Sequence, residues 1–388
     1  MPLPGQHRDR SLTASRREWL RVREYLQQHR HELGQAVAGE YADVLKVEGT
    51  SLLSRPDWLP SGPIPLEAID LEFAPDTPFT GLTGTASVTV ALCPQRPDGS
   101  RYPSYAAAMA DLTAPAVFEN CSTYRLLNAD LPAPRGRLMF GRGTYFDGID
   151  VGEAAAHEYA AGQREGTDTP LRAAIGHPCD PARRPMNLAI STLTIRHDPD
   201  ADKATFLLHW RDPAKVGHAG GLCMVVPVGI FQASDDQPGN ERNDFSLWRC
   251  MVREYAEELL GESENHGSGH SPLDYAAWPF AARMTDALHT GRIRAHVLGM
   301  GVDPLTFATD LLTVVVFDAA LFDELFADLV HTNAEGRLVG AAPSRPLEGF
   351  PLTIDPLLCT IRYPLQAAGA ATLNLVRRHR CVLRLPHR

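Results

Sequence analysis

The segment LWRCMVREYAEELLG, residues 247–261, decides the fold. Its apolar side chains recur at helical spacing and predict one buried helix face. These side chains are Trp248, Met251, Val252, Tyr255 and Leu259. The glutamates Glu254, Glu257 and Glu258 stand at i, i+3 and i+4, so they share a second face of the same helix. Because a glycine commonly forms the left-handed end of a helix, we predict that the helix stops at Gly261.

Three carboxylates on one helical turn repel each other. A bound divalent cation would turn this repulsion into coordination, since hard cations such as Mg²⁺ take oxygen ligands and share them with substrate phosphates. Arg253 precedes the three glutamates and can pair with a carboxylate to hold their geometry. The spacing alone does not distinguish this site from a plain, solvated surface helix.

The order of these residues resembles the Nudix hydrolase superfamily. Residues 253–261 resemble the R-E-x-x-E-E core of the Nudix box, and Val226-Pro227-Val228-Gly229 ends a predicted strand much as the P-G-G segment of that family does. Downstream, Asn333-Ala334-Glu335-Gly336 resembles a Glu-Gly turn that often follows the later Nudix strands. The resemblance covers roughly residues 186–380, about half of the chain.

The resemblance implies a Mg²⁺- or Mn²⁺-dependent hydrolysis of a nucleoside diphosphate linked to another group. It implies Glu257 and Glu258 as leading metal ligands, and Glu254 as a further ligand or as the base that deprotonates a water. Arg253 belongs to the same catalytic set. The carbonyl of Gly229 would add a metal ligand, and Glu335 is a weaker candidate for contact with the substrate.

The sequence departs from the family spacing, G-x5-E-x7-R-E-U-x-E-E-x-G-U, at two places. Counting back from the arginine places Gly239 first and Phe245 where the first glutamate belongs. If Gly229 is the box glycine instead, the loop is longer and Glu241 is the displaced acid. The closing glycine, Gly261, also comes one residue late. These departures motivate an alternative function, a non-catalytic Nudix-like nucleotide sensor or protein-interaction module with a regulatory role.

The full chain also resembles a group of actinobacterial regulators. In those proteins a helix-turn-helix unit often precedes segments like REWLRVREYL, residues 17–26 here. This chain starts almost at that segment, so no reading helix is expected. The net charge, 37 basic against 47 acidic residues or −10, also disfavours the clustered basic surface that DNA binding needs. We therefore expect a nucleotide-like small molecule as partner and no direct DNA contact, with homodimerisation left open.

Alternating strand and helix patterns predict an α/β or α+β fold. We expect an N-terminal helix and proline-rich connector (1–66), a smaller mixed α/β unit (67–185), and a Nudix-like mixed sheet between helices (186–388). Strands are predicted at 87–93, 118–127, 186–196, 204–211, 220–231 and 311–318, and a late helix at 366–380.

Three local features of the first half carry their own predictions. Ser15 and Glu18 form the S-x-x-E pattern that caps a helix start. The stretch from residue 140 is expected to be a Gly-rich turn that enters a helix near Asp150. On that helix Glu153 and His157 stand at i and i+4, and we interpret them as part of a solvated face.

Composition limits the location of the protein. No apolar run approaches the ~18 residues of a membrane span, and the N-terminus has no apolar core that would make it a secretory signal. The seven cysteines contain no C-x-x-C pair and are expected to be reduced thiols. A cytoplasmic protein without membrane attachment is the expectation.

Overall fold

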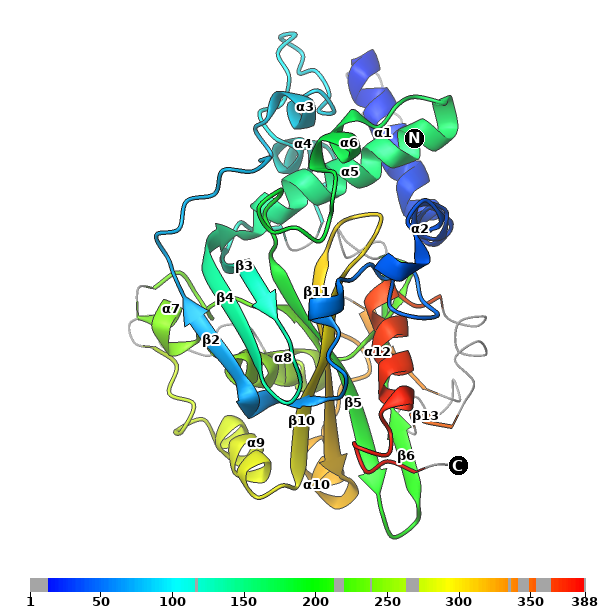
Figure 1. Ribbon diagram of the computed structural model, residues 1–388. Coiled ribbons are helices and arrows are strands. Elements are labelled where there is room, and N and C mark those ends of the chain that lie inside the picture. The colour runs from blue at the N-terminus through cyan, green and yellow to red at the C-terminus, as the bar shows by residue number, and fades with distance from the viewer. Residues whose placement is uncertain are drawn as a thin grey trace, which may run out of the picture.

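The computed structural model has an α/β fold, as predicted, with helices around mixed parallel and antiparallel sheets (Figure 1). It describes residues 13–115, 118–212, 220–237, 239–262, 272–333, 336–340, 349–353 and 364–386. Within these residues, no helix is both long and apolar enough to cross a membrane. The expected cytoplasmic location stays a prediction.

The main sheet is built around β5 (Leu188–Asp198). β5 pairs in parallel with β11 (Thr309–Asp318) and antiparallel with β6 (Lys203–Phe206) and β9 (Val228–Ile230). On the far side of β11 lies β10 (Ile293–Val302), which is antiparallel to it. The parallel pair is buried almost throughout, as expected for strands that are covered on both faces.

Two short strands close the edges of this sheet: β1 (Ile64–Pro65) pairs with β10, and β13 (Phe350–Pro351) pairs with β6. Two further sheets have three strands each. One contains β12 (Gly336–Val339), β7 (Leu208–Arg211) and β8 (Cys223–Val225). The other contains β2 (Ile69–Phe73), β4 (Gly136–Thr144) and β3 (Ser122–Asp130).

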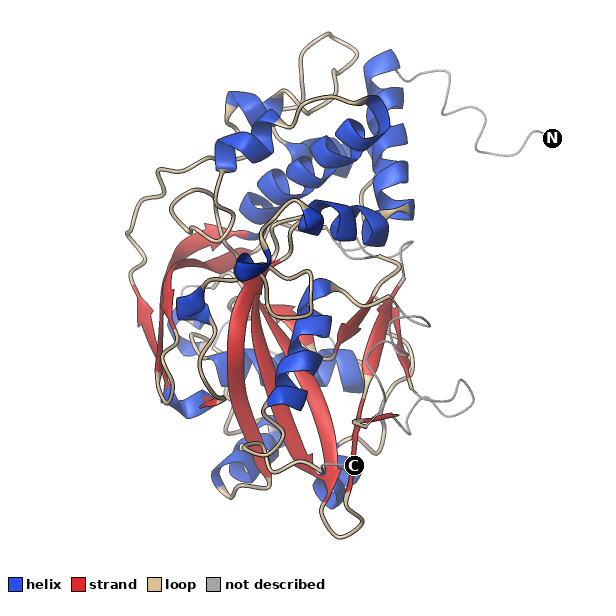
Figure 2. Ribbon diagram, turned by 45° about the vertical axis from the view of Figure 1, so that its right-hand side comes forward, coloured by secondary structure: helices blue, strands red, loops and turns tan. Residues whose placement is uncertain are grey.

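Helices lie on both faces and beyond one end of the main sheet. The helices of the first half gather beyond that end (Figures 1 and 2): α1 (Ala14–Gln28), α2 (Arg30–Gly39), α3 (Ser87–Val90), α4 (Tyr105–Leu112), α5 (Tyr145–Glu165) and α6 (Pro170–Ile175). The second half supplies α7 (Asn240–Asn243), α8 (Leu247–Leu260), α9 (Pro279–His289), α10 (Ala319–Leu325) and α12 (Ala367–Arg378).

Alternation along β11 shows how the sheet is covered. Leu312, Val314 and Val316 belong to the hydrophobic cluster that contains α12. Leu311 and Phe317 belong to the cluster that contains the apolar face of α8. Because successive strand side chains point to opposite faces, α12 and α8 cover opposite faces of the sheet. The predicted mixed sheet between helices is therefore present in the second half of the chain.

The division at residues 66 and 185 stays a prediction. β1, from the first predicted segment, pairs with β10 of the third. The largest hydrophobic cluster contains Trp19, Tyr124 and Tyr255, one residue from each predicted segment. The three segments thus share one core, which places residues of the first half beside strands of the second.

The predicted strand at 87–93 is wrong, because Ser87–Val90 form the short helix α3. The expected Gly-rich turn after residue 140 is also wrong, since its glycines belong to β4. A Cβ at Gly143 would lie 2.9 Å from the Cβ of Arg125, so the glycine permits close strand packing. The following helix, α5, begins at Tyr145 instead of near Asp150.

The N-terminal helix also starts differently from the prediction. Its N-cap is Thr13, whose hydroxyl accepts from the backbone N–H of Arg16. The hydroxyl of Ser15 instead accepts from the N–H of Gln95. The chain turns at His29 and continues as α2, so the predicted single helix is two.

Two predicted strands are each divided between sheets. Residues 204–211 form the end of β6 in the main sheet and then β7 in the second sheet. Residues 220–231 form β8 and β9, which are separated at Pro227. A proline has no N–H to donate to a ladder, so it is suited to the point where the chain changes sheets.

Candidate functional site

Helix α8 forms where the sequence predicts it. Ser246 caps its start by accepting from the N–H of Arg249, and Gly261 ends it with a left-handed φ of 69°. Val252 and Tyr255 are buried, whereas Trp248 is half-buried and donates its indole N–H to Thr285. The inward face therefore points into the core, which leaves the acidic face for other contacts.

Glu254, Glu257 and Glu258 all line one cavity of about 280 Å³, together with Gly229. The cavity lies where α8, β9 and the starts of β5 and β11 meet helix α5. Its volume approaches the lower end of the range for small-molecule pockets. The structure thus brings together four of the residues that the sequence nominates.

Gly229 and Glu254 are in direct contact. A Cβ added at residue 229 would overlap the carboxyl group of Glu254. The glycine therefore lets this carboxylate lie against strand β9. Because the overlapping atoms are the far end of a flexible side chain, a larger residue would displace the carboxylate and leave the backbone in place.

Both carboxylate oxygens of Glu258 have contacts with neighbouring residues. It is 5% exposed, and its Oε1 accepts from the N–H of Val228 at 2.8 Å. Its Oε2 lies 3.9 Å from Nδ1 of His209, whose Nε2 is 3.2 Å from Oδ1 of Asn333. Glu258 therefore joins α8 to the residue before Gly229, and its replacement would alter structure as well as chemistry.

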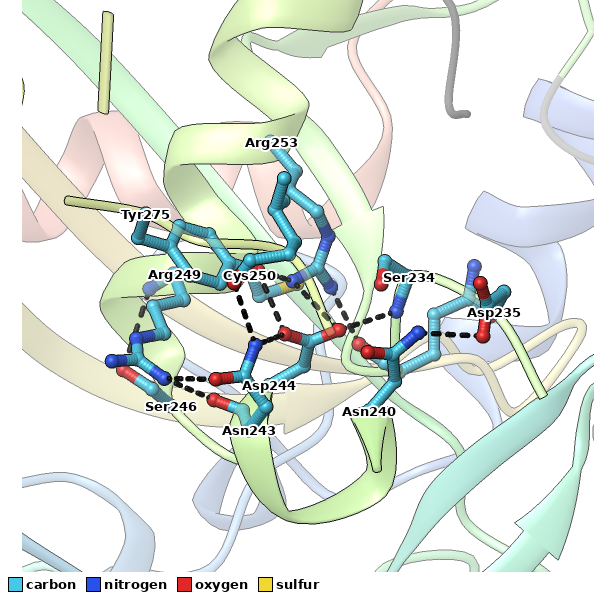
Figure 3. A network of polar contacts seen from close by, with 12 residues as sticks. Ser234, Asp235, Asn240, Asn243, Asp244, Ser246, Arg249, Cys250, Arg253 and Tyr275 are labelled. Carbon is cyan, nitrogen blue, oxygen red and sulfur yellow. Dashed lines mark hydrogen bonds and ion pairs between the residues drawn. The ribbon is translucent and has the colours of Figure 1, made fainter. Parts of the chain in front are cut away.

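Arg253 belongs to a polar network between α8 and the loop before it (Figure 3). Its guanidinium donates to the carbonyl of Gln232 at 2.6 Å and to the hydroxyl of Tyr275 at 2.5 Å. Asp244 lies 3.8 Å from the same group and accepts from the N–H of Ser234 at 2.8 Å. Arg253 therefore positions α8 against the preceding loop.

Asp244 is the acidic partner that the sequence analysis missed. It stands one residue before Phe245, the position that the family spacing assigns to the first glutamate. Phe245 packs among aromatic rings, with Tyr124 at 5.0 Å between ring centroids. Glu241, nominated as the displaced acid, instead pairs with Arg142 at 2.6 Å, outside the set of cavity-lining residues. A tolerance of one residue in the spacing would have found Asp244.

Segments far apart in the sequence complete the cavity. α5 contributes Tyr145 and Gly152, the stretch before β5 contributes Arg184 and Asn187, and β11 contributes Thr309. Acidic lining residues outnumber basic ones by six to two. The acidic ones are Glu119, Glu153, Glu254, Glu257, Glu258 and Asp310, and the basic ones are Arg184 and Arg211.

The predicted solvated face of α5 is wrong. Glu153 is 1% exposed, and its carboxylate pairs with both Arg23 and Arg30. His157 is also buried, with Nδ1 3.0 Å from the hydroxyl of Tyr105. Burial lowers the pKa of His157 to about 3, so the imidazole is neutral at physiological pH. Helices α1 and α2 pack against this polar face of α5, so its side chains are buried between helices.

Glu335, the weaker candidate for substrate contact, lies outside the described residues. Its role stays a prediction. Asn333, two residues earlier in the same predicted turn, is described and contacts His209. Through His209, the described part of this turn is therefore linked to Glu258.

The cavity carboxylates do not form a complete metal cage. Among the described residues, no three His, Cys, Asp or Glu side chains converge closely enough to hold a metal ion. Mg²⁺ in proteins is usually bound by one or two carboxylates together with substrate phosphates and waters. The oxygen donors of Glu254 and Glu257 fit such a shared site, in which the ligand brings the remaining oxygens.

Comparisons with known proteins do not identify a family for this chain. No family model matches the chain, and no curated protein matches it. A solved NUDIX hydrolase from Alicyclobacillus acidocaldarius is similar at 16% identity over 49% of this chain and 91% of that chain, with a TM-score of 0.25. A likeness of this size carries no argument about function, which has to come from the cavity itself.

Proposed function

We propose that the chain is a Mg²⁺- or Mn²⁺-dependent hydrolase that cleaves the diphosphate of a nucleoside diphosphate derivative. One observation carries this proposal: three glutamates from a single helical turn, Glu254, Glu257 and Glu258, line one cavity beside Gly229. A solvated surface helix would leave these side chains in water. Here they line one side of a cavity that is open to solvent.

The charge of the cavity supports a cation-dependent ligand. Glu153 is paired with Arg23 and Arg30, but the other five acidic lining residues still outnumber the two basic ones, so the cavity repels a free diphosphate. A divalent cation that travels with the diphosphate removes this repulsion and takes its remaining ligands from the protein. The same wall therefore selects for the metal complex of the ligand over the metal-free form.

The chain's own residues have distinct roles in this proposal. Glu254 and Glu257 would hold the cation, which when bound would draw charge from the bridging phosphates. Glu254 is also placed to accept a proton from a water, because its carboxyl lies against Gly229 at the cavity wall. Glu258 fixes the distance between α8 and β9, and Arg253 fixes the helix against its loop.

A calorimetric titration followed by product analysis tests the function. We expect compounds such as ADP-ribose, NADH or coenzyme A, titrated with Mg²⁺ or Mn²⁺, to bind and to be cleaved at the diphosphate. With EDTA in place of the metal, binding should weaken by at least about tenfold, because the carboxylates then repel the phosphates. Equal binding in EDTA, or no binding to any diphosphate, would remove the proposal.

The second candidate is binding without cleavage, as in a nucleotide sensor. It is favoured by Glu258, one oxygen of which is already committed to the N–H of Val228. The same titration separates the candidates, since a sensor returns the ligand intact and a hydrolase does not.

The contact between Gly229 and Glu254 gives a second test. Gly229→Ala should displace the carboxylate of Glu254 from β9 and lower turnover by about tenfold or more, a barrier change of about 1.4 kcal/mol. The melting temperature should change little, because a side-chain end moves and the backbone does not. Gly34→Ala is the control, since nothing lies within 4 Å of its added Cβ. Unchanged turnover in Gly229→Ala would show that Glu254 has no part in the reaction.

A further inference from the structure

Arg184 is a buried cation at the cavity wall, and it has no acidic partner among the residues that the structure describes. It is 3% exposed, and its guanidinium donates to three neutral oxygens: the carbonyls of Pro178 and Pro185 at 3.1 and 3.2 Å, and the hydroxyl of Thr309 at 3.1 Å. No carboxylate in the described part of the chain lies within ion-pair distance of it. Both Arg184 and Thr309 line the cavity.

Three other buried arginines have a counter-charge, whereas Arg125 and Arg172 donate to neutral oxygens as Arg184 does. Arg23 and Arg30 share the carboxylate of Glu153, and Arg253 lies 3.8 Å from Asp244. An unpaired buried charge is costly, and proteins normally pair such groups. Burial lowers the pKa of Arg184, but only to about 10, so the group remains charged at neutral pH. Unlike Arg125 and Arg172, Arg184 lines the cavity, so an anion in the cavity can supply its counter-charge.

The sheet register separates Arg184 from the acidic wall. Thr309, which binds Arg184, stands opposite Leu188 on the neighbouring strand β5. On the other side of β5, β9 carries Gly229, against which Glu254 lies. Gly229 stands opposite Ile190, two residues along β5 from Leu188. Two strand spacings of about 4.8 Å and this offset of about 6.7 Å put Thr309 and Gly229 about 12 Å from each other. Arg184 and Thr309 thus line a different part of the cavity from Glu254.

We propose that Arg184 and Thr309 form an oxyanion subsite that binds a second anionic group of the ligand, remote from the diphosphate. A guanidinium with a neighbouring hydroxyl suits a phosphate or a carboxylate, both of which accept charge-assisted hydrogen bonds. This inference rests on the proposed function for its diphosphate end. It narrows the substrate class to nucleoside diphosphate derivatives that carry a further anionic group.

Ligand pairs that differ by a single phosphate test the subsite. NADP⁺ is compared with NAD⁺, and coenzyme A with dephospho-coenzyme A, by calorimetry in Mg²⁺. In at least one pair the wild type should prefer the extra phosphate by about tenfold, the scale of a charged hydrogen bond. Arg184→Met should reduce this ratio to about one, and Arg184→Lys, which keeps the charge, should retain part of it.

A matched control comes from another buried arginine. Arg125 also donates to carbonyl oxygens, those of Thr77 and Arg142, but does not line the cavity. Arg125→Met should therefore keep the wild-type preference even if it lowers stability. Equal affinity of wild type for both members of each pair, or a preference that persists in Arg184→Met, would overturn the subsite.

A simpler measurement separates the subsite from the proposed function. Without nucleotide or metal, inorganic phosphate or acetate is compared with chloride at equal ionic strength, and the melting temperature is recorded. An oxyanion that binds the folded state raises the melting temperature of the wild type, and Arg184→Met should remove the increase. If no nucleotide binds but this protection persists, the hydrolase proposal fails and the subsite stands. If nucleotides bind as metal complexes without phosphate preference or protection, only the subsite fails.

Discussion

Replacing Glu257 by glutamine is expected to abolish most of the diphosphate hydrolysis. Glu257 lies on the cavity wall and is only partly buried, so an amide of the same shape fits with little structural change. The substitution removes one of the two carboxylates assigned to the cation. Loss of a single electrostatic contact to a transition state typically lowers turnover by about 10²–10³-fold, and we expect a fall of this order.

Steady-state turnover of a cleaved diphosphate, measured with Mg²⁺, checks this result. Glu241→Gln is the control, because Glu241 pairs with Arg142 and does not line the cavity. It should turn over like the wild type. For a sensor without turnover, the equivalent result is a loss of Mg²⁺-dependent affinity in Glu257→Gln. A variant that matches the wild type in both turnover and metal-dependent affinity would exclude Glu257 from the site.

The sequence predicted the part of the site that depends on local periodicity. The spacing of Glu254, Glu257 and Glu258 determines that they share a helix face, and Ser246 and Gly261 set the ends of that helix through local capping. That the acidic face borders a cavity with Gly229 followed from the resemblance and from the order of strand and helix. These features depend on neighbouring residues in the sequence more than on long-range contacts, so the sequence alone could predict them.

The opposite wall of the cavity could not be read from the sequence. Arg184 meets Thr309 across 125 residues, and the pairing is set by the register of β5 with β11. Glu153 looked like a solvated residue because its partners lie on α1 and α2, more than 120 residues earlier. Local patterns carry no signal for such contacts, because tertiary packing decides which polar side chains become buried.

The family spacing placed the first acidic residue at the wrong position because of the local structure of the loop. The loop before α8 includes the short helix α7, so a fixed count to the first acid is not reliable. The aspartate at 244 pairs with Arg253, while the phenylalanine at the counted position fills an aromatic cluster with Phe73 and Tyr124. The nearest acid to the counted position is therefore Asp244, one residue before it, and it lies 3.8 Å from Arg253.

The pairing of Asp244 with Arg253 gives the largest expected effect on stability. Asp244 is fully buried and Arg253 is 7% exposed, so Asp244→Asn leaves a buried guanidinium without its counter-charge. Breaking such a pair from one side typically costs about 3–5 kcal/mol. We expect the free energy of unfolding, measured by urea denaturation, to fall by this amount.

Two comparisons make this result specific. Glu241→Gln breaks a pair between partly exposed side chains, Glu241 and Arg142, and should change the free energy of unfolding by no more than about 1 kcal/mol. The double variant Asp244→Asn with Arg253→Met removes the stranded charge and should recover part of the loss, which appears as a coupling energy in a double-mutant cycle. If Asp244→Asn alone unfolds within about 1 kcal/mol of the wild type, Asp244 is not the counter-charge of Arg253, and α8 is held against its loop by the bonds to Gln232 and Tyr275 alone.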